Sequence, residues 1–150
     1  MATRSTIALE FADGTVQMVY CHWDGYIDHN GVILYEHYSD PFKLRDLIDL
    51  GDLSSLRPTI GVQHPFSSIG TMDSAEYEKQ FGEMCTFYGR DRGETSIAYK
   101  AFKDFEDYKA NHQYEEYEYI LRKDGFWYVS QYGRDYEMLG KALERQTEEA

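Results

Sequence analysis

The chain has 150 residues, a length that suits one domain able to bury a core without disulfides or metal ions. Its 27 acidic and 15 basic residues give a formal net charge of −12, and a field of that sign repels the phosphates of nucleic acids. Direct binding of DNA or RNA is therefore disfavoured, and no apolar run approaches the roughly 18 residues of a membrane helix.

The N-terminal segment predicts a β-hairpin. Apolar and polar side chains alternate over residues 6–11, which is the period of a half-buried strand. Asp13-Gly14 is typical of a two-residue hairpin turn, because a type I′ turn needs positive φ at both central positions. The return strand runs from Val16 to about Trp23 and carries bulky side chains on both faces. We therefore predict a central strand that is covered on both sides.

Two helices are expected next. The first is short, begins near Asn30 and turns Tyr35 towards the core. The second is marked more strongly, by Asp40 as N-cap, by Pro41 at the first helical position and by Gly51 as a left-handed stop.

The middle of the chain predicts less regular structure. Residues 52–71 are rich in Gly, Pro and Ser but keep apolar positions, which indicates an ordered loop lying on the core. A capping-box pattern predicts a helix over 73–81. Residues 83–94 are typical of an exposed turn, 96–101 of a strand and 102–110 of an aromatic-rich helix.

A second hairpin is predicted near the C-terminus. Its strands cover 117–121 and 126–132, and Asp124-Gly125 forms the turn. A final amphipathic helix is expected over 136–145.

These elements predict one globular domain over 1–150, in which 146–150 form a frayed tail. The two Asp-Gly hairpins are expected to meet in one antiparallel sheet covered by several short helices. The predicted fold class is therefore α+β.

Residues 20–26 combine a thiol, an imidazole, a carboxylate and three aromatic rings. They include zinc-ligand types, but the chain has no C-x-x-C pair and no H-E-x-x-H motif, and Cys21 and His22 would point to opposite faces of a strand. We therefore predict no metal site and no cofactor. A nucleophilic Cys21 would need His37 or His64 as its base, and the local signatures of cysteine hydrolases are absent.

The cysteines also indicate a compartment. Cys21 and Cys85 lie far apart in sequence and in unlike contexts, so a disulfide framework is not expected. The first residues lack the apolar stretch of a signal peptide. A reducing cytoplasm is the expected location.

An alternative function is a small-ligand module or sponge, or an enzyme, with a pocket for a nucleotide-like ligand near Tyr20–Tyr26. No P-loop and no G-x-G-x-x-G motif supports it. The residues assigned to this site are Arg4, Cys21, His22, Trp23, Asp24, Tyr26 and His37.

An acidic, tyrosine-rich segment over 104–119 is the main candidate for partner binding. Carboxylates can mimic the charge spacing of a duplex, and tyrosines are favoured in protein interfaces. The alternative is a solvated strand face. The residues assigned to partner binding are Asp104, Asp107, Tyr108, Tyr114, Glu115, Glu116, Tyr117, Glu118 and Tyr119.

Three stretches carry a family resemblance: ATRSTIA over 2–8, VYCHWDGY over 19–26 and LGDLSSL over 50–56, with Gly31 and His37-Tyr38 between them. Together they resemble a group of small proteins encoded by tailed bacteriophages, prophages and other mobile elements. The resemblance transfers no catalytic or binding residue.

The resemblance implies an accessory protein in the cytoplasm of a bacterial host, where antirestriction and anti-CRISPR proteins, several of them acidic DNA mimics, interfere with host enzymes. We therefore predict a non-enzymatic protein that binds and inhibits a host defence or nucleic-acid-handling protein with a basic surface. Nucleic-acid mimicry is one means of doing so. The sequence predicts no oligomeric state.

Overall fold

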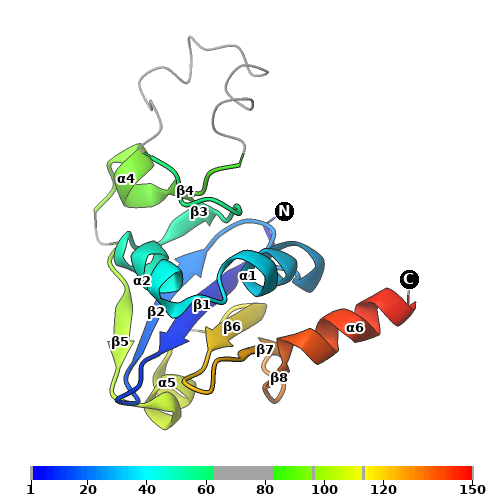
Figure 1. Cartoon of the computed structure of the whole chain (residues 1–150). Helices are drawn as coiled ribbons and strands as arrows, with labels where there is room; N and C mark the ends of the chain where they lie inside the picture. Colours follow the sequence, from blue (N-terminus) through cyan, green and yellow to red (C-terminus); the bar gives the residue numbers. More distant parts are fainter. Residues whose placement is uncertain (1, 63–82, 96, 113, 150) are drawn as a thin grey trace.

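The computed structural model describes residues 2–62, 83–95, 97–112 and 114–149, with only the backbone described for 147–149 (Figure 1). The described residues form one eight-stranded sheet in the order β4-β3-β2-β1-β6-β7-β8, and β5 also pairs with β2. The strands are β1 Ser5–Glu10, β2 Val16–Cys21, β3 Leu53–Ser55, β4 Thr86–Phe87, β5 Lys100–Phe102, β6 Tyr117–Leu121, β7 Trp127–Gln131 and β8 Glu137–Met138. The helices are a π-helical turn, η1 Ile27–Gly31, and α1 Val32–His37, α2 Pro41–Asp49, α4 Tyr88–Arg92, α5 Phe105–Asn111 and α6 Leu139–Glu149.

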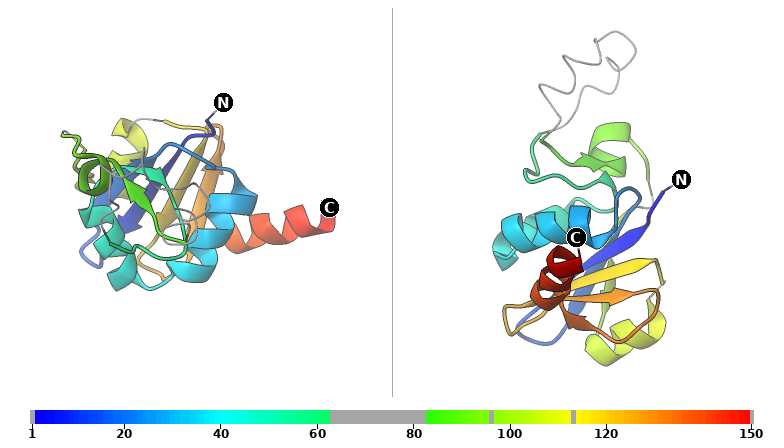
Figure 2. Two further views of the ribbon diagram at one scale, coloured as in Figure 1. Left: turned by 90° about the horizontal axis from the view of Figure 1, so that it is seen from above. Right: turned by 90° about the vertical axis from the view of Figure 1, so that its right-hand side faces the viewer.

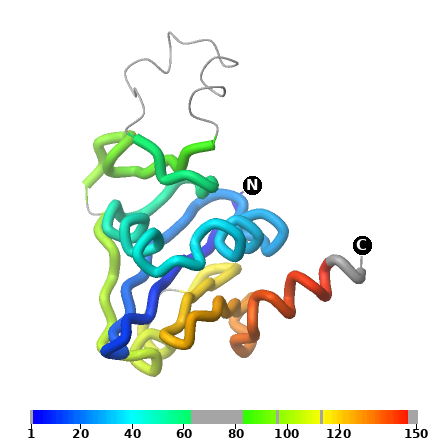
Figure 3. Tube along the Cα trace, in the orientation of Figure 1, coloured from blue at the N-terminus to red at the C-terminus, as the bar shows by residue number. Residues whose placement is uncertain are grey.

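The α+β class and both Asp-Gly hairpins are confirmed. Most neighbouring strands run antiparallel, but the two hairpins join through a parallel pair, in which Ser5 of β1 lies opposite Tyr117 of β6. Figure 3 shows these two strands side by side, β1 in blue and β6 in yellow. A second parallel contact joins β2 to β3 at Cys21 and Leu53. The sheet is therefore mixed rather than purely antiparallel.

The larger core lies on the face of the sheet covered by η1, α1, α2 and α6, which we call the helical face (Figure 2). Alternate residues of the central strands, such as Ile7 and Val19, meet Leu34, Leu44 and Leu47 of the helices there. All of these side chains are fully buried. This packing buries the apolar stripes that the helical periodicity predicts.

The opposite face of the sheet is covered by α5, and we call it the α5 face. Ala8, Val16, Met18 and Ile120 point to this side and form a smaller core with Tyr108. Because β1 and β2 bury side chains on both faces, the predicted central position of the return strand is confirmed.

Local signals were accurate at α2 and incomplete at α1. The Asp40 carboxylate accepts a hydrogen bond from the Phe42 N–H at 3.0 Å, and Gly51 has φ +87° as the stop. The first helical segment begins at Ile27, earlier than predicted. The prediction for Tyr35 was wrong, because this residue is 48% exposed, with its hydroxyl beside Gly140 of α6.

The middle of the chain is more ordered than its composition indicates. Residues 83–94 contain β4 and α4 instead of an exposed turn, because the buried Asp91 carboxylate accepts a hydrogen bond from the Phe87 N–H at 2.7 Å. The predicted loop contains β3. At the C-terminus, α6 continues to Glu149 through the predicted tail. The predicted helix over 73–81 lies outside the described residues.

Candidate functional site

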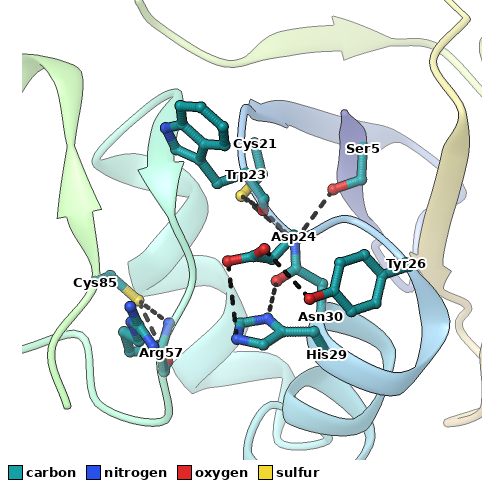
Figure 4. A network of polar contacts seen from close by, with 9 residues as sticks. All are labelled: Ser5, Cys21, Trp23, Asp24, Tyr26, His29, Asn30, Arg57 and Cys85. Carbon is teal, nitrogen blue, oxygen red and sulfur yellow. Dashed lines mark hydrogen bonds and ion pairs between the residues drawn. The ribbon is translucent and has the colours of Figure 1, made fainter. Parts of the chain in front are cut away.

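The Tyr20–Tyr26 stretch forms a structural junction. At its centre, the buried Asn30 amide donates hydrogen bonds to the Ser5 hydroxyl at 3.3 Å, the Cys21 sulfur at 3.5 Å and the Trp23 carbonyl at 3.3 Å (Figure 4). These contacts join β1 and β2 to η1.

Gly25 closes the same junction. Its N–H donates to the Thr3 carbonyl at 2.8 Å, and its own carbonyl accepts from the Tyr119 hydroxyl at 2.6 Å. A Cβ added at this position would lie 2.8 Å from the Ser5 Cβ, which no ordinary contact allows. A glycine is needed here because two backbone segments approach closely.

The thiols lie in the core and have no nucleophile geometry. Cys21 is fully buried, and burial raises the pKa of its thiol to about 12. Burial also raises the pKa of Cys85, which accepts a hydrogen bond from the Arg57 N–H at 3.3 Å. His37 is exposed at the end of α1, and His64 lies outside the described residues. In the part of the chain that is described, no three His, Cys, Asp or Glu side chains are grouped as metal ligands.

The residues of the predicted ligand site do not converge. Tyr20 and His22 are hydrogen-bonded at 2.7 Å between the hydroxyl and Nδ1, on the side of β2 opposite Cys21. Trp23 is 42% exposed and meets the His22 ring edge-on at 4.7 Å. Of the residues assigned to the ligand site by sequence, Arg4 lines a cleft elsewhere, and Tyr20 of the neighbouring stretch lines it too.

That cleft lies on the α5 face and has a volume of about 540 Å³. Its floor is formed by Thr6 and Met18, and Tyr20 lies at one end. One wall is β5, and the other is the C-terminal end of α5. Sequence reasoning missed it because residues from five separate segments meet there.

A buried polar pair lies behind the cleft. The His112 Nε2 faces the Glu118 carboxylate, and both side chains are at most 1% exposed. The His112 Nδ1 donates to the Tyr108 carbonyl, and the two rings stack at 4.2 Å. Burial raises the pKa of Glu118 to about 7 and lowers the pKa of His112. His112 lines the cleft, but its Nδ1 is held by the Tyr108 carbonyl and its Nε2 is directed at the Glu118 carboxylate.

The predicted partner-binding segment divides into buried and accessible residues. Tyr108, Glu118 and Tyr119 are fully buried, so these three side chains do not belong to the accessible surface of the segment. The physical reason is that both faces of β6 are covered. Helix α5 covers one of them, and the helices of the helical face cover the other. Asp104 caps α5 by accepting from the Asp107 N–H at 2.8 Å.

The other members of that segment remain accessible. Asp107 accepts a hydrogen bond from the Lys103 N–H at 2.9 Å, and Tyr114 is 60% exposed. Glu115, Glu116 and Tyr117 are half-buried.

The fold brings part of this segment to the junction. Because β6 starts beside β1, Tyr117 lies near η1, which follows Asp24 and Tyr26 along the chain. We call the resulting patch the tyrosine–carboxylate surface. Its members are Asp24, Tyr26, Asp28, Glu116, Tyr117 and Tyr132.

Contacts between the side chains support this grouping. The Tyr117 and Tyr132 rings are 5.4 Å apart, and Tyr132 is 62% exposed. Burial and then the Tyr132 hydroxyl raise the pKa of Tyr117 to about 12, with smaller effects from the carboxylates of Glu116 and Asp28. The Tyr26 hydroxyl donates to the Asp24 carboxylate at 3.3 Å.

Two further properties distinguish this surface. Among the residues that the structure describes, the non-glycine positions with positive φ are Asp24 at +58° and Tyr132 at +51°, and both belong to it. Within the described ranges, no Lys or Arg forms an ion pair with its carboxylates. The one ion pair that they make there joins Asp24 to His29 at 4.0 Å.

Comparison with known proteins returned no match to this chain among protein-family models, curated proteins or solved structures. Across the described residues, no helix combines the length and apolar character needed to cross a membrane. The fold and its surfaces define the chain as an α+β protein with a mixed sheet, a cleft on one face and an acidic aromatic surface at one end.

Proposed function

We propose that this protein is a non-enzymatic accessory protein of phage type that binds and inhibits a host defence or nucleic-acid-handling protein. The tyrosine–carboxylate surface is the contact we propose for that partner. The observation that carries the proposal is the gathering of Asp24, Asp28 and Glu116, without Lys or Arg partners among the described residues, around the accessible Tyr26 and Tyr132.

The chemistry of this surface suits a basic partner. Tyrosines supply large rigid contact areas that dominate many interfaces, and carboxylates without a Lys or Arg partner of their own complement Lys and Arg across an interface. The net charge of −12 adds long-range attraction towards a basic surface, which raises the association rate at low salt. Nucleic-acid mimicry would be one use of such a surface.

The backbone conformation supports a functional role. A bulky residue rarely adopts positive φ, and positions of this kind persist where the surrounding structure enforces them, often at functional sites. Tyr132 and Gly133, both with positive φ, are the central residues of the turn after β7, which the Arg134 N–H closes by donating to the Gln131 carbonyl at 3.0 Å, and this turn holds the Tyr132 ring exposed.

The resemblance of the N-terminal stretches to phage and prophage proteins supplies the biological setting of the proposal. An acidic protein in the cytoplasm of an infected bacterium meets many basic nucleic-acid-binding proteins. The inhibitory role rests on that setting, whereas the binding role rests on the geometry.

The test is affinity capture from bacterial lysate with two doubly substituted variants that lose the same charge. Asp28→Asn with Glu116→Gln changes the surface, and Asp46→Asn with Glu144→Gln changes exposed acids elsewhere. We expect the wild type and the second variant to retain a basic protein that the first variant loses. Raising salt from about 50 to about 500 mM should release it, because exposed charge pairs are screened.

The inhibitory part is tested on the captured protein. If it is a nuclease or another nucleic-acid-handling enzyme, added wild-type protein should lower its activity, and the Asp28/Glu116 variant should do so much less. Recovery of no basic protein, or equal recovery with both variants, would contradict the proposal.

A further inference from the structure

The cleft on the α5 face carries two side-chain cations. Arg4 lies just before β1, and Lys100 begins β5 on the far side of β2. Neither the Arg4 guanidinium nor the Lys100 ammonium has a hydrogen bond or ion pair to another side chain within the described ranges. Each cation lies near a carboxylate of the same cleft, Lys100 near Asp52 and Arg4 near Glu115, but forms no ion pair with it in the described ranges, so both cations stay available to an anionic group.

The cleft also presents acceptors. Asp52 uses one carboxylate oxygen to accept the Tyr20 N–H at 2.9 Å, and within the described ranges the other oxygen accepts no hydrogen bond from the protein. Glu115 lines the cleft as well and is half-buried. A ligand that satisfies both kinds of group needs an anionic part together with hydroxyl or amino donors.

The remaining lining is apolar and held in place. The Phe102 ring meets the Tyr108 ring edge-on at 5.5 Å and the His112 ring edge-on at 6.5 Å, which restricts its orientation. Met18 supplies an adaptable apolar floor beside it. The volume of about 540 Å³ lies within the range of about 300–1,000 Å³ found for small-molecule sites.

We propose that this cleft binds a small organic anion of the nucleoside-monophosphate type. Arg4 and Lys100 hold the phosphate, Asp52 and Glu115 accept hydrogen bonds from the sugar or the base, and Phe102 packs against the planar base. The site shares no side chain with the tyrosine–carboxylate surface, although the Arg4 N–H donates to the Glu116 carboxylate at 3.4 Å, and neither proposal depends on the other.

The first experiment is thermal unfolding of the full chain with AMP, GMP, CMP or UMP. At about 100 times its Kd, a ligand of the folded state should raise Tm by about 5–10 °C. The matching nucleosides, ribose 5-phosphate and inorganic phosphate serve as probes of the separate parts, and we expect each to bind at least about 10-fold more weakly than the best nucleotide.

The second experiment uses variants with a matched control. Lys100→Ala and Arg4→Ala should each weaken binding of that nucleotide about 10-fold or more, because each removes a charge-assisted contact. Lys103→Ala removes an exposed charge outside the cleft and should leave the affinity unchanged. Tm values without ligand show whether each variant is folded.

Three results would overturn the proposal. One is that no nucleotide shifts Tm; another is that inorganic phosphate binds as tightly as any nucleotide; a third is that Lys100→Ala and Arg4→Ala bind like the wild type. Each result leaves the protein-binding proposal intact, because the variants used there change Asp28 and Glu116.

Discussion

The two faces of the sheet bury different chemistry. The helical face buries aliphatic side chains from α1, α2 and α6 together with both thiols. The α5 face buries a smaller apolar core and encloses Thr6, His112 and Glu118 within it. The α5 face thus has the smaller apolar core and encloses an ionisable pair, and buried polar groups cost free energy unless they are paired.

The difference coincides with the position of the cleft, which opens on the α5 face beside His112. One face therefore holds the larger apolar core, and the other keeps polar groups next to the cleft. Substitutions on the two faces should accordingly differ in size and in their dependence on pH.

The largest effect is expected on the helical face. Leu47→Ala removes a fully buried side chain of α2 and should lower the free energy of unfolding by about 2–5 kcal/mol, through lost transfer energy and the cavity left behind. Urea denaturation followed by circular dichroism measures this. Phe42→Ala on the same helix, where the ring is 67% exposed, is the control and should cost less than about 1 kcal/mol. Equal losses would show that α2 does not pack as described.

The next effect is expected on the α5 face and depends on pH. The pKa of Glu118 is raised from 4.5 in the unfolded chain to about 7 in the folded protein, so the folded state binds more protons between these values. Its contribution to stability is therefore present below pH 4.5 and is lost as the pH rises to about 7. The Glu118→Gln variant has no ionisable group at this position. Its free energy of unfolding relative to that of the wild type should therefore rise by up to about 3 kcal/mol as the pH increases across this window.

Urea denaturation at a series of pH values tests this expectation. The lowered pKa of His112 gives an opposite slope below its ordinary value of 6.5, and because His112 contacts residue 118, the comparison reports the titration of the pair. Glu144→Gln, at an exposed position of α6, is the control and should follow the wild type within about 0.5 kcal/mol. Parallel curves for wild type and Glu118→Gln would contradict a buried, proton-binding carboxyl group.

The smallest effect is expected for the thiols. Burial raises the pKa of Cys21 to about 12 and also raises that of Cys85, so almost no thiolate is present in the native state. A thiol reagent at about pH 8 should label neither cysteine until the chain is unfolded, when both react. Rapid labelling of native Cys21 would revive the interpretation of this residue as a nucleophile.

Elements with local signals could be predicted from the sequence. The Asp13-Gly14 and Asp124-Gly125 turns and the cap at Asp40 depend on residues within a few positions, and all three are present. The prediction for residues 83–94 failed because Gly, Arg and Asp are typical of a turn. In the tertiary structure, Asp91 instead holds β4 and α4 together.

The candidate sites were harder to predict, for the same reason. The alternation in β6 indicated a solvated Glu118, but α5 covers that face and pairs the carboxylate with His112. The tyrosine–carboxylate surface draws on residues near 24–28 and 116–132. They meet because β1 and β6 pair in parallel, and no local pattern specifies that pairing.

The β1–β6 pairing also determines when the centre of the sheet can form during synthesis of the chain. Ser5 and Tyr117 are partners across 112 positions of the chain, so β1 leaves the ribosome well before its central neighbour exists. At about 5–20 residues per second, this interval lasts about 5–20 seconds. During that time the first hairpin presents an unpaired strand edge, which is a site for chaperone binding or for aggregation. The second hairpin therefore completes the centre of the sheet as a late step.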